Sequence, residues 1–302
     1  MGDGPYILKG TLTDFIETFK DEASCVDYLM QTRWPDGETV CARCDNDRFW
    51  KTARHQLKCS RCKAKFSVRH GTIFYQSRLP LQKWFVGLWL MVNNKKGANS
   101  CHLARELGIT QKSAWFMVHR VNQIAQDMAI KVRLNGIVEI DDMFVGGKES
   151  NKPVAKRVRT RKNKTPVVGL TERAGALRLA KVPTIAQSAL RPVFDSVLRD
   201  PEAIFTDAHH AYRELDRRII NHTNKEFVNG VVHVNTIEGV FSHFKRTING
   251  IHHSISSKHM QRYLDMFSVR WNSRDTDNVQ RFNMFLSNSA TGKISYSTLI
   301  KN

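Results

Sequence analysis

Four cysteines fall into two close pairs that have the spacing of a metal site. Cys41 and Cys44 are separated by two residues, fourteen residues follow, and Cys59 and Cys62 form a second pair with the same spacing. Each pair can present two thiolates to one tetrahedral ion, and fourteen residues suffice for a short hairpin between the pairs. Two disulfides are the alternative, which a reducing intracellular compartment disfavours. The spacing therefore predicts one structural Zn²⁺.

Three carboxylates stand where acids are unusual in a chain that has 47 basic and only 28 acidic residues. Asp141 lies inside an apolar segment, Asp207 ends another, and Glu238 lies on a later segment with helical spacing. Carboxylates gathered on one sheet repel one another and need a cation, and hard divalent ions such as Mg²⁺ prefer oxygen ligands. Two such ions about 3.5–4 Å apart can activate a nucleophile and stabilise the leaving oxygen of a phosphodiester. Helix caps and salt bridges are the alternative uses of such acids, and spacing alone leaves both open.

The elements that would position these acids follow from hydrophobic periodicity. Short apolar runs predict strands, and apolar residues spaced by three and four predict helices. The resulting order is β-β-β-α-β, with further helices after it. The predicted strands are 137–145, 166–171, 177–182 and 203–206, with an extended segment at 231–234, and the predicted helices are 185–198, 208–217, 236–246 and a last one capped by Ser256 or Ser257.

The segment between residues 80 and 130 has the pattern of a helix-turn-helix. An apolar helix at 81–92 is followed by a short helix capped by Ser100, a break at Gly108 and a longer helix capped by Thr110. In such motifs the second helix enters the major groove of DNA. An αα-hairpin within an ordinary helical bundle is the alternative. The residues that the second helix would offer to DNA are Gln111, Lys112, Ser113 and Arg120.

The charge balance indicates the class of partner. A formal net charge of +19 exceeds what solubility requires, so a polyanion is expected. Nucleic acid is favoured over an anionic membrane because no basic amphipathic helix accompanies the charge. No run of about 18 apolar residues is present, and the first residues lack the pattern of a signal peptide. We therefore expect a cytoplasmic protein that has no membrane partner.

Basic residues are concentrated in one loop beside the acidic site. Between Lys148 and Lys164 there are eight Lys and Arg residues against the single acid Glu149, without any apolar period. The loop either lies on DNA phosphates, which we favour, or is a solvated turn. Basic and aromatic residues around the cysteine pairs, Trp50 among them, suit either a DNA-facing surface or a solvated surface over a structural zinc. The loop residues expected at DNA are Arg157, Arg159, Arg161 and Lys162.

Several longer motifs carry a resemblance to a known family. They extend over nearly the whole chain, from the cysteine pairs to the last helix. The motifs are Arg33-Trp34-Pro35-Asp36-Gly37, Phe66-Ser67-Val68, Gly71-Thr72-Ile73-Phe74, Ala114-Trp115-Phe116-Met117, Val138-Glu139-Ile140-Asp141, Phe144-Val145-Gly146-Gly147-Lys148, Thr206-Asp207, Asn235-Thr236-Ile237-Glu238-Gly239, Lys245-Arg246 and His259-Met260-Gln261-Arg262-Tyr263-Leu264. In these motifs the chain resembles the zinc-ribbon insertion-sequence transposases of bacteria, relatives of the Merlin superfamily, which belong to the DDE class.

The resemblance implies a role for each acid. Asp141, Asp207 and Glu238 would be the ligands of two Mg²⁺ or Mn²⁺ ions, and Lys245 would be the basic residue that follows the third acid. Glu238 and Lys245 are about two helical turns apart, so they share one face of their helix. A lysine on that face can reach a phosphate beside the metals.

Two positions depart from the family pattern. The position after the first acid is usually Glu and is Asp142 here, a shorter carboxylate with the same charge. Some members are described with Asn as the third ligand, and Asn235 precedes Glu238 by three residues. Asn235 also fits the N-cap of the helix, as in a capping box. We favour Glu238 as the third ligand, with Asn235 next to the site.

The resemblance implies a multidomain α+β and α/β architecture. It consists of an N-terminal helical segment, a zinc ribbon, a helix-turn-helix DNA-binding domain, an RNase H-like mixed-sheet catalytic domain and a C-terminal tail. The implied activity is that of a DNA transposase, which cuts at terminal inverted repeats and joins the freed ends to target DNA, as a homodimer or larger synapse. A transposase-derived regulator without catalysis and a metal-dependent nuclease are the alternatives. The domain bounds are 1–35, 36–75, 80–130, 135–275 and 276–302.

Overall fold

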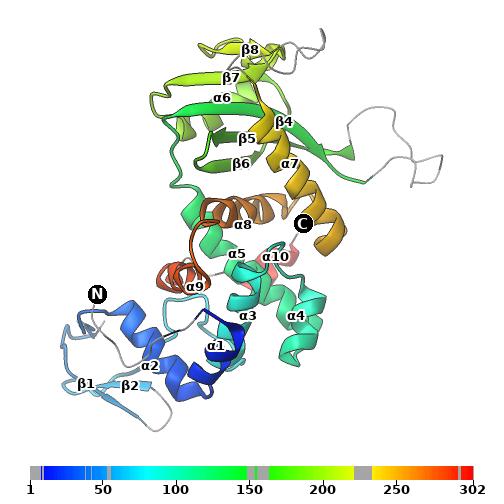
Figure 1. Ribbon diagram of the computed structural model, residues 1–302. Coiled ribbons are helices and arrows are strands. Elements are labelled where there is room, and N and C mark those ends of the chain that lie inside the picture. The colour runs from blue at the N-terminus through cyan, green and yellow to red at the C-terminus, as the bar shows by residue number, and fades with distance from the viewer. Residues whose placement is uncertain are drawn as a thin grey trace. The chain divides into compact units, whose positions relative to one another are not determined.

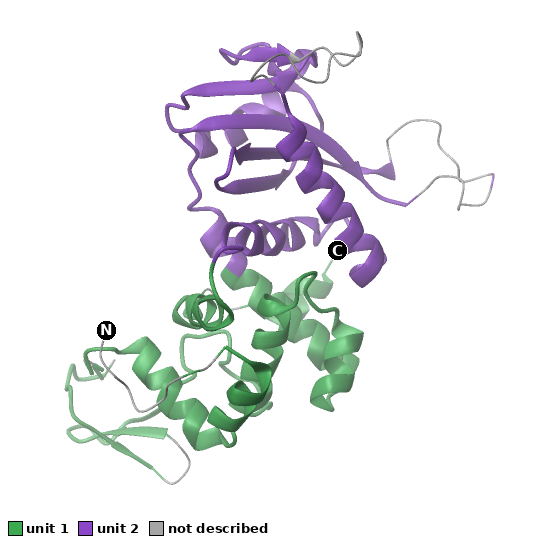
Figure 2. Ribbon diagram, viewed as in Figure 1, with its two compact units in different colours: residues 1–124, 276–302 green, residues 125–275 purple. Residues whose placement is uncertain are grey.

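The structure, a computed structural model, divides into two compact units. It describes residues 8, 10–37, 39–41, 43–52, 56–147, 154, 163–220, 233–291 and 294–301. Unit 1 combines Met1–Ile124 with Thr276–Asn302, and unit 2 is Ala125–Asp275 (Figure 2). Helices occur in both units, together with one three-stranded and one five-stranded sheet among the described residues, so the multidomain α+β architecture is confirmed.

A small antiparallel sheet forms the ribbon of unit 1. It follows α1 (Leu12–Thr18) and α2 (Glu22–Arg33), and its strands lie in the order β1-β2-β3 (Figure 1). The rings of Phe49 and Phe66 pack edge to face across the sheet, 5.2 Å apart between centroids. Because three short strands bury few apolar side chains, such a ribbon depends on its metal for stability. The strands are β1 (Phe49–Lys51), β2 (Gln56–Cys59) and β3 (Lys65–Ser67).

Three helices follow the ribbon, and their bounds agree closely with the predicted ones. They are α3 (Leu81–Asn93), α4 (Ser100–Leu107) and α5 (Gln111–Ala129). Gly108 ends α4 in the left-handed conformation, with φ of 57°, which glycine adopts at little cost. Thr110 accepts the backbone N–H of the third α5 residue at 3.2 Å, as expected of a cap. The predicted cap of α4 was wrong by one residue, because the side chain of Asn99 accepts the N–H of His102.

The last residues of the chain return to the core of unit 1. They contain α9 (Asn278–Ser287) and α10 (Tyr296–Ile300). The fully buried ring of Phe282 on α9 lies 4.9 Å from that of Phe15 on α1 and 5.5 Å from that of Phe85 on α3. Nothing in the sequence indicated this packing, because α9 and its partners are some 200 residues apart.

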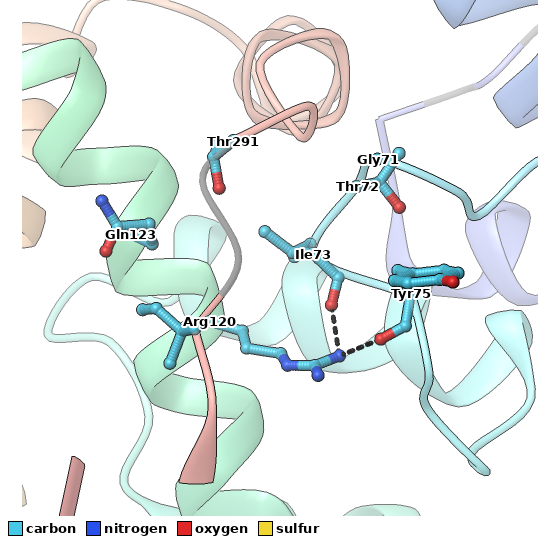
Figure 3. Close-up of a pocket in the computed structure, with 8 residues that line it drawn as sticks. Gly71, Thr72, Ile73, Tyr75, Arg120, Gln123 and Thr291 are labelled. Carbon is cyan, nitrogen blue, oxygen red and sulfur yellow. Dashed lines mark hydrogen bonds between the residues drawn. The ribbon is translucent and has the colours of Figure 1, made fainter. Parts of the chain in front are cut away.

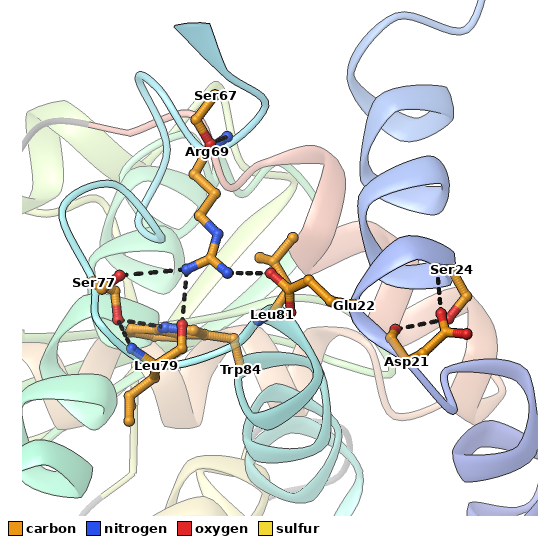
Figure 4. A network of polar contacts seen from close by, with 9 residues as sticks. All are labelled: Asp21, Glu22, Ser24, Ser67, Arg69, Ser77, Leu79, Leu81 and Trp84. Atoms are coloured by element: carbon orange, nitrogen blue, oxygen red, sulfur yellow. Dashed lines mark hydrogen bonds and ion pairs between the residues drawn. The ribbon is translucent and has the colours of Figure 1, made fainter. Parts of the chain in front are cut away.

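A polar network joins the segment after the ribbon to α2 and α3. The Arg69 guanidinium pairs with the Glu22 carboxylate and donates to the carbonyl oxygen of Leu79 at 2.7 Å (Figure 4). The other oxygen of Glu22 accepts the backbone N–H of Leu81 at 2.7 Å. Since Pro80 gives α3 no side-chain cap, a carboxylate from α2 serves the N-terminus of α3.

Unit 2 is built on a mixed sheet in the order β6-β5-β4-β7-β8 (Figure 1). The strand pairs β4–β5 and β5–β6 are antiparallel, whereas β4–β7 and β7–β8 are parallel. The central strand β4 has the predicted bounds to the residue. The strands are β4 (Ile137–Val145), β5 (Thr165–Glu172), β6 (Leu177–Lys181), β7 (Ala203–Asp207) and β8 (Arg218–Ile220).

Helices cover both faces of this sheet. On one face, α7 (Asn235–Thr247) and α8 (Met260–Asn272) bury their apolar stripes against a cluster that includes Met143 of β4. On the other face, α6 (Gln187–Val197) packs against a cluster that includes Ile140. Neighbouring residues of β4 therefore contribute to different cores, as the period of two in a strand requires.

Helix α8 also satisfies the backbone of β6, which lies at one edge of the sheet. The amide of Asn272 accepts the N–H of Leu177 at 2.7 Å and donates to its carbonyl at 3.1 Å. The amide of Gln261 accepts the N–H of Lys181 at 2.7 Å and donates to the carbonyl of Leu179 at 3.1 Å. An exposed edge strand can pair with another chain, and these side chains occupy the groups through which it would do so.

Two predicted elements of unit 2 differ from the structure. The predicted helix 208–217 was wrong, since the region holds only a 3₁₀ turn at His210–Tyr212 before β8 begins. Arg217 donates to the hydroxyl of Thr206 and to the carbonyl of Asp207, which fixes the segment to the end of β7 instead. Helix α8 lacks the predicted serine cap and begins without any side-chain cap. Residues 231 and 232 of the predicted extended segment lie outside the described residues.

Candidate active site and zinc centre

The four predicted cysteines converge on one point of the ribbon. Their sulfur atoms all lie within 4.8 Å of one another, with 3.6 Å between those of Cys41 and Cys62 and between those of Cys44 and Cys59. Sulfurs on a tetrahedral Zn²⁺ with bonds of about 2.3 Å stand roughly 3.8 Å apart. None of the four is in a disulfide, so the donor set fits one structural zinc.

The backbone of the second knuckle prepares a thiolate. Burial opposes ionisation of Cys59, but the backbone N–H groups of Cys62 and Arg61, together with the thiols of Cys44 and Cys62, lower the pKa of its thiol to about 6. Since Zn²⁺ binds the deprotonated form, the knuckle favours the binding state of this ligand before any metal arrives.

Asp141 lies in the middle of the central strand β4, on the face covered by α7 and α8. It stands opposite Gly169 of β5, where an added Cβ would come within 2.8 Å of the α7 side chains. Burial raises the pKa of the Asp141 carboxyl to about 7, and the negative charges of Asp142, Asp207 and Glu238 add to the shift. The site therefore has an uncompensated negative potential that a cation would relieve.

Asp207 is brought beside Asp141 by the parallel pairing of β4 and β7. Ile140 pairs with Thr206, so the residue after each comes at the same level of the sheet. One carboxylate oxygen of Asp207 accepts the backbone N–H of His209 at 3.0 Å. This bond orients the side chain at the point where β7 ends.

Glu238 comes to the site from the first turn of α7. It lines a cavity of about 500 Å³ together with Asp141, Lys164 and Lys245. The structure thus places Glu238 and Lys245 on one wall, as their spacing of seven residues predicted. Lys164, the last residue of the basic segment, was not predicted as a site residue. The basic segment has no regular apolar spacing from which the direction of its side chains could be inferred.

The carboxylates are not as tightly clustered as the cysteines. Within the described parts of the chain, the four cysteines are the one group of three or more such side chains whose ligand atoms lie within 4.8 Å of one another. A pair of ions about 3.5–4 Å apart needs ligand atoms that are spread more widely than those around a single ion. The oxygen donors come from the middle of β4, the end of β7 and the first turn of α7, and such carboxylates fit hard divalent cations.

Asp142 points to the other face of the sheet from Asp141. Its carboxylate accepts the hydroxyl hydrogen of Tyr212 at 3.0 Å, and Tyr212 is fully buried. Burial, with the charge of Asp142 next, raises the pKa of the Tyr212 hydroxyl well above its usual range. The phenol therefore stays a hydrogen-bond donor to Asp142 at every pH the protein meets.

The remaining predicted site residues lie at the start of α7, at the start of α5 and in the basic loop. Asn235 is the exposed first residue of α7 and does not cap it, because the capping position belongs to Val234. Gln111 and Lys112 are exposed at the start of α5, where Gln111 donates to the hydroxyl of Ser100 at 2.9 Å and the Lys112 ammonium lies 4.6 Å from the ring centre of Tyr296. The basic residues Arg157, Arg159, Arg161 and Lys162 lie outside the described residues. The hydroxyl of Ser113 accepts a hydrogen bond from the cap residue Thr110 at 2.9 Å.

Arg120 is not available to DNA, which corrects its predicted role. The residue is 6% exposed, and its guanidinium donates to the carbonyl oxygens of Ile73 and Tyr75 at 2.7 and 2.9 Å (Figure 3). It therefore ties α5 to the segment after the ribbon. Helical spacing placed Arg120 on the same face as Ser113, but the sequence could not show that this face is covered by a distant loop.

Comparison with known proteins identifies both parts of the chain. Residues 133–272, which contain all three acids and Lys245, match the family described as ISXO2-like transposase domain. Residues 20–65, which contain all four cysteines, match the family described as transposase zinc-ribbon domain. The chain is thus similar to an ISXO2-like transposase domain over one stretch and to a transposase zinc ribbon over another. The first match extends from just before β4 to the end of α8.

A relative that covers most of the chain agrees with these matches. The chain is similar to the "Uncharacterized protein in transposable element ISH50" of Halobacterium salinarum, with 27% identity over 277 residues that cover 84% of this chain and 92% of the relative. No solved structure matches the chain. In the transposase domain and the rest of the described chain, no helix is both long enough and apolar enough to cross a membrane.

Proposed function

We propose that this protein is a DNA transposase of the DDE class that cuts DNA at the terminal inverted repeats of its element and joins the freed 3′ ends to target DNA. The single observation that carries the proposal is the coupling of Asp141, Asp207 and Glu238 across two parallel strands and a helix, within a transposase domain. A buried carboxyl whose pKa is raised by burial and by three neighbouring carboxylates is typical of a functional site.

The proposed ligands of the divalent cations are Asp141, Asp207 and Glu238. When bound, two Mg²⁺ or Mn²⁺ ions supply activation of the attacking oxygen and stabilisation of the leaving oxygen. In the first step, water attacks a phosphodiester and leaves a 3′-hydroxyl; in the second, that hydroxyl attacks a target phosphodiester and displaces its 3′ oxygen. Lys164 and Lys245 line the cavity at the positions from which their charges would bind the phosphates.

Unit 1 is the proposed DNA-binding part. The ring of Trp50 is 52% exposed on the ribbon, and the ammonium of Lys63 lies 4.5 Å from its centre. The start of α5 presents Gln111 and Lys112 as exposed side chains, and Ser113 is partly exposed. A ribbon with an exposed aromatic ring among cations and a helix start with exposed polar side chains together suit the phosphates and base edges of a duplex. The loop residues Arg157, Arg159, Arg161 and Lys162 remain proposed contacts to DNA.

Both ends of an element must be held together for strand transfer. We therefore propose a homodimer or larger synaptic assembly in which each chain supplies one acidic site. A two-fold assembly would match the inverted symmetry of the repeats.

The test is cleavage and joining of a labelled duplex that carries the inverted repeats flanking the gene, in Mg²⁺ or Mn²⁺. Wild-type protein should give joined products, and Asp207→Asn should lose them because it removes a cation ligand. Asp195→Asn is the matched control, since Asp195 is an exposed acid of the same unit, paired with Arg191 on α6. It should retain wild-type activity.

Other outcomes identify the alternatives. Cleavage without joining would indicate a nuclease. Tight binding of the repeats without chemistry in either ion would indicate a regulator and would overturn the transposase proposal. Equal loss of activity in Asp195→Asn would also count against a specific role for Asp207.

A further inference from the structure

Glu139 is a buried, hydrogen-bonded acid of unit 2 to which the proposed chemistry assigns no role. Glu139 is 0% exposed and lies on β4, two residues before Asp141 and on the same face. Both of its oxygens are hydrogen-bonded. A buried carboxylate is costly unless it is fully paired, so its partners indicate what it does.

Its partners on one side are the first residues of α7. One oxygen, Oε2, accepts the backbone N–H groups of Thr236 and Ile237 at 2.8 and 3.1 Å. The other, Oε1, accepts the hydroxyl of Thr236 at 3.0 Å. Val234, at the capping position of α7, provides no side-chain cap. A strand carboxylate therefore takes the place of the cap, where the N-terminal N–H groups and the helix dipole favour a negative charge.

The partners on the other side hold the carboxylate in place. Nε of Arg173, just after β5, donates to Oε1 of Glu139 at 2.8 Å, and the same guanidinium donates to the carbonyl of His233 at 3.0 Å. The guanidinium also lies 4.6 Å from the ring centre of Phe205, on the strand that leads to Asp207. Arg173 thus links Glu139 to the residue that precedes α7 and to the strand of the second acid.

This arrangement fixes the distance between the first and third acids. Glu238 follows Ile237 directly, and its N–H continues the helix by donating to Val234 at 3.2 Å. Asp141 lies two residues from Glu139 on one rigid strand, and Glu238 lies one residue from the N–H groups that Glu139 holds. A shift of α7 along the sheet would break three hydrogen bonds to a buried charge.

We propose that Glu139 is a positioning residue that docks the start of α7 on β4 and so sets Glu238 at the correct separation from Asp141 for divalent-cation binding. The proposal rests on the proposed function for the identity of the site, but it concerns cation binding and is tested without catalysis. Removal of partners that orient metal ligands typically weakens metal binding about 10- to 100-fold.

The experiment measures Mn²⁺ binding to the zinc-loaded full-length protein, without DNA, by calorimetry and by electron paramagnetic resonance of free Mn²⁺. Asp141→Asn identifies the binding that belongs to the acidic site. Glu139→Gln should raise the Kd of that site at least tenfold while zinc content and circular dichroism stay as in the wild type.

The chain offers a closely matched control. Asp265 on α8 is also 0% exposed and paired with an arginine, Arg178 of β6, but it docks a helix that carries none of the three acids. Asp265→Asn removes an equivalent buried charge from the same unit. It should leave the Mn²⁺ Kd within about twofold of the wild type, even if it lowers the melting temperature as much as Glu139→Gln.

A milder variant keeps the proposal testable if Glu139→Gln does not fold. Thr236→Val removes one hydrogen bond to Glu139 and leaves both charges in place, and we expect it to raise the Kd about threefold or more. A wild-type Kd in folded Glu139→Gln, or in Thr236→Val if the glutamine variant does not fold, would overturn the proposal. Equal weakening by Asp265→Asn, or Mn²⁺ binding that does not depend on Asp141, would also overturn it. Failure of the proposed function has a different signature, namely Asp141-dependent Mn²⁺ binding without DNA cleavage.

Discussion

At the scale of single residues, the carboxylates of the acidic site repel one another, and a bound cation would relieve that repulsion. Burial and three neighbouring carboxylates raise the pKa of Asp141 to about 7. Each pKa unit corresponds to about 1.4 kcal/mol of unfavourable interaction with the charged form. The same residue that would hold the ion therefore destabilises the protein when the ion is absent.

Because the charged Asp141 carboxylate is unfavourable without a cation, we predict that replacing it stabilises the metal-free protein. Asp141→Asn should raise the melting temperature in Mg²⁺-free buffer at pH 8, by about 2–4 °C for each 1 kcal/mol relieved in a unit of this size. Added Mg²⁺ should stabilise the wild type and leave the variant unchanged. Scanning calorimetry with the zinc retained measures both effects. A variant that melts below the wild type without Mg²⁺ would contradict the repulsion.

Burial also lowers the pKa of His252, which lies just after α7. Burial, then the charges of Arg270 and His253, lower the pKa of His252 from 6.5 to about 4. The folded protein thus keeps this imidazole neutral where the unfolded chain protonates it, so stability is full above pH 6.5 and falls as the pH drops toward 4. At pH 5 the loss from this group is about 2 kcal/mol.

Urea unfolding at pH 7.5 and pH 5 tests this assignment. His252→Gln removes the titrating group, so its loss of unfolding free energy between the two pH values should be about 2 kcal/mol smaller than in the wild type. An identical pH dependence in both proteins would show that the imidazole is not held neutral.

At the scale of elements, helix starts in both units are served by carboxylates from elsewhere in the chain. Glu22 of α2 accepts the N–H of Leu81 at the start of α3, and Glu139 of β4 accepts two N–H groups at the start of α7. In each case the residue at the capping position provides no side-chain bond and an arginine pairs with the carboxylate. Such a cap fixes a helix to its neighbour, whereas a local cap only ends it.

Helix α9 should contribute substantially to the stability of unit 1, because its Phe282 ring is fully buried there. Phe282→Ala takes a fully buried ring out of the aromatic cluster around Phe15 and Phe85, which should cost about 3–5 kcal/mol of unfolding free energy. Ile300→Ala, at a residue of α10 that is 55% exposed, should cost little. Equilibrium unfolding followed by near-ultraviolet circular dichroism compares the two. Similar losses in both variants would contradict a core role for α9.

Local pattern predicted the elements well and their long-range partners poorly. The apolar run of β4, the glycine after α4 and the cysteine pairs are contained in a few residues, and each prediction was confirmed. The expected helix 208–217 failed because Arg217 bonds to the end of β7, and Arg120 failed as a DNA contact because a distant loop covers it. Glu139 was seen only as part of a motif, because its partners are almost 100 residues away.

At the scale of the whole molecule, the charge of +19 should govern binding to DNA. Each phosphate neutralised by Lys or Arg releases a counterion, so the logarithm of the binding constant falls linearly with the logarithm of the salt concentration. If 6 to 10 phosphates are contacted, affinity should fall about 10³- to 10⁵-fold between 50 and 200 mM salt. Fluorescence anisotropy on a repeat duplex measures the slope. A slope near zero would contradict electrostatic binding.

The central claim is that the cations held by Asp141, Asp207 and Glu238 act on the scissile phosphate itself. The most direct measurement replaces one non-bridging oxygen of that phosphate with sulfur and compares joining in Mg²⁺ and Mn²⁺. Mg²⁺ binds sulfur poorly, whereas the softer Mn²⁺ accepts it. We predict that one sulfur isomer abolishes joining in Mg²⁺ and that Mn²⁺ restores it. Equal joining of the oxygen and sulfur substrates in both ions would contradict the account.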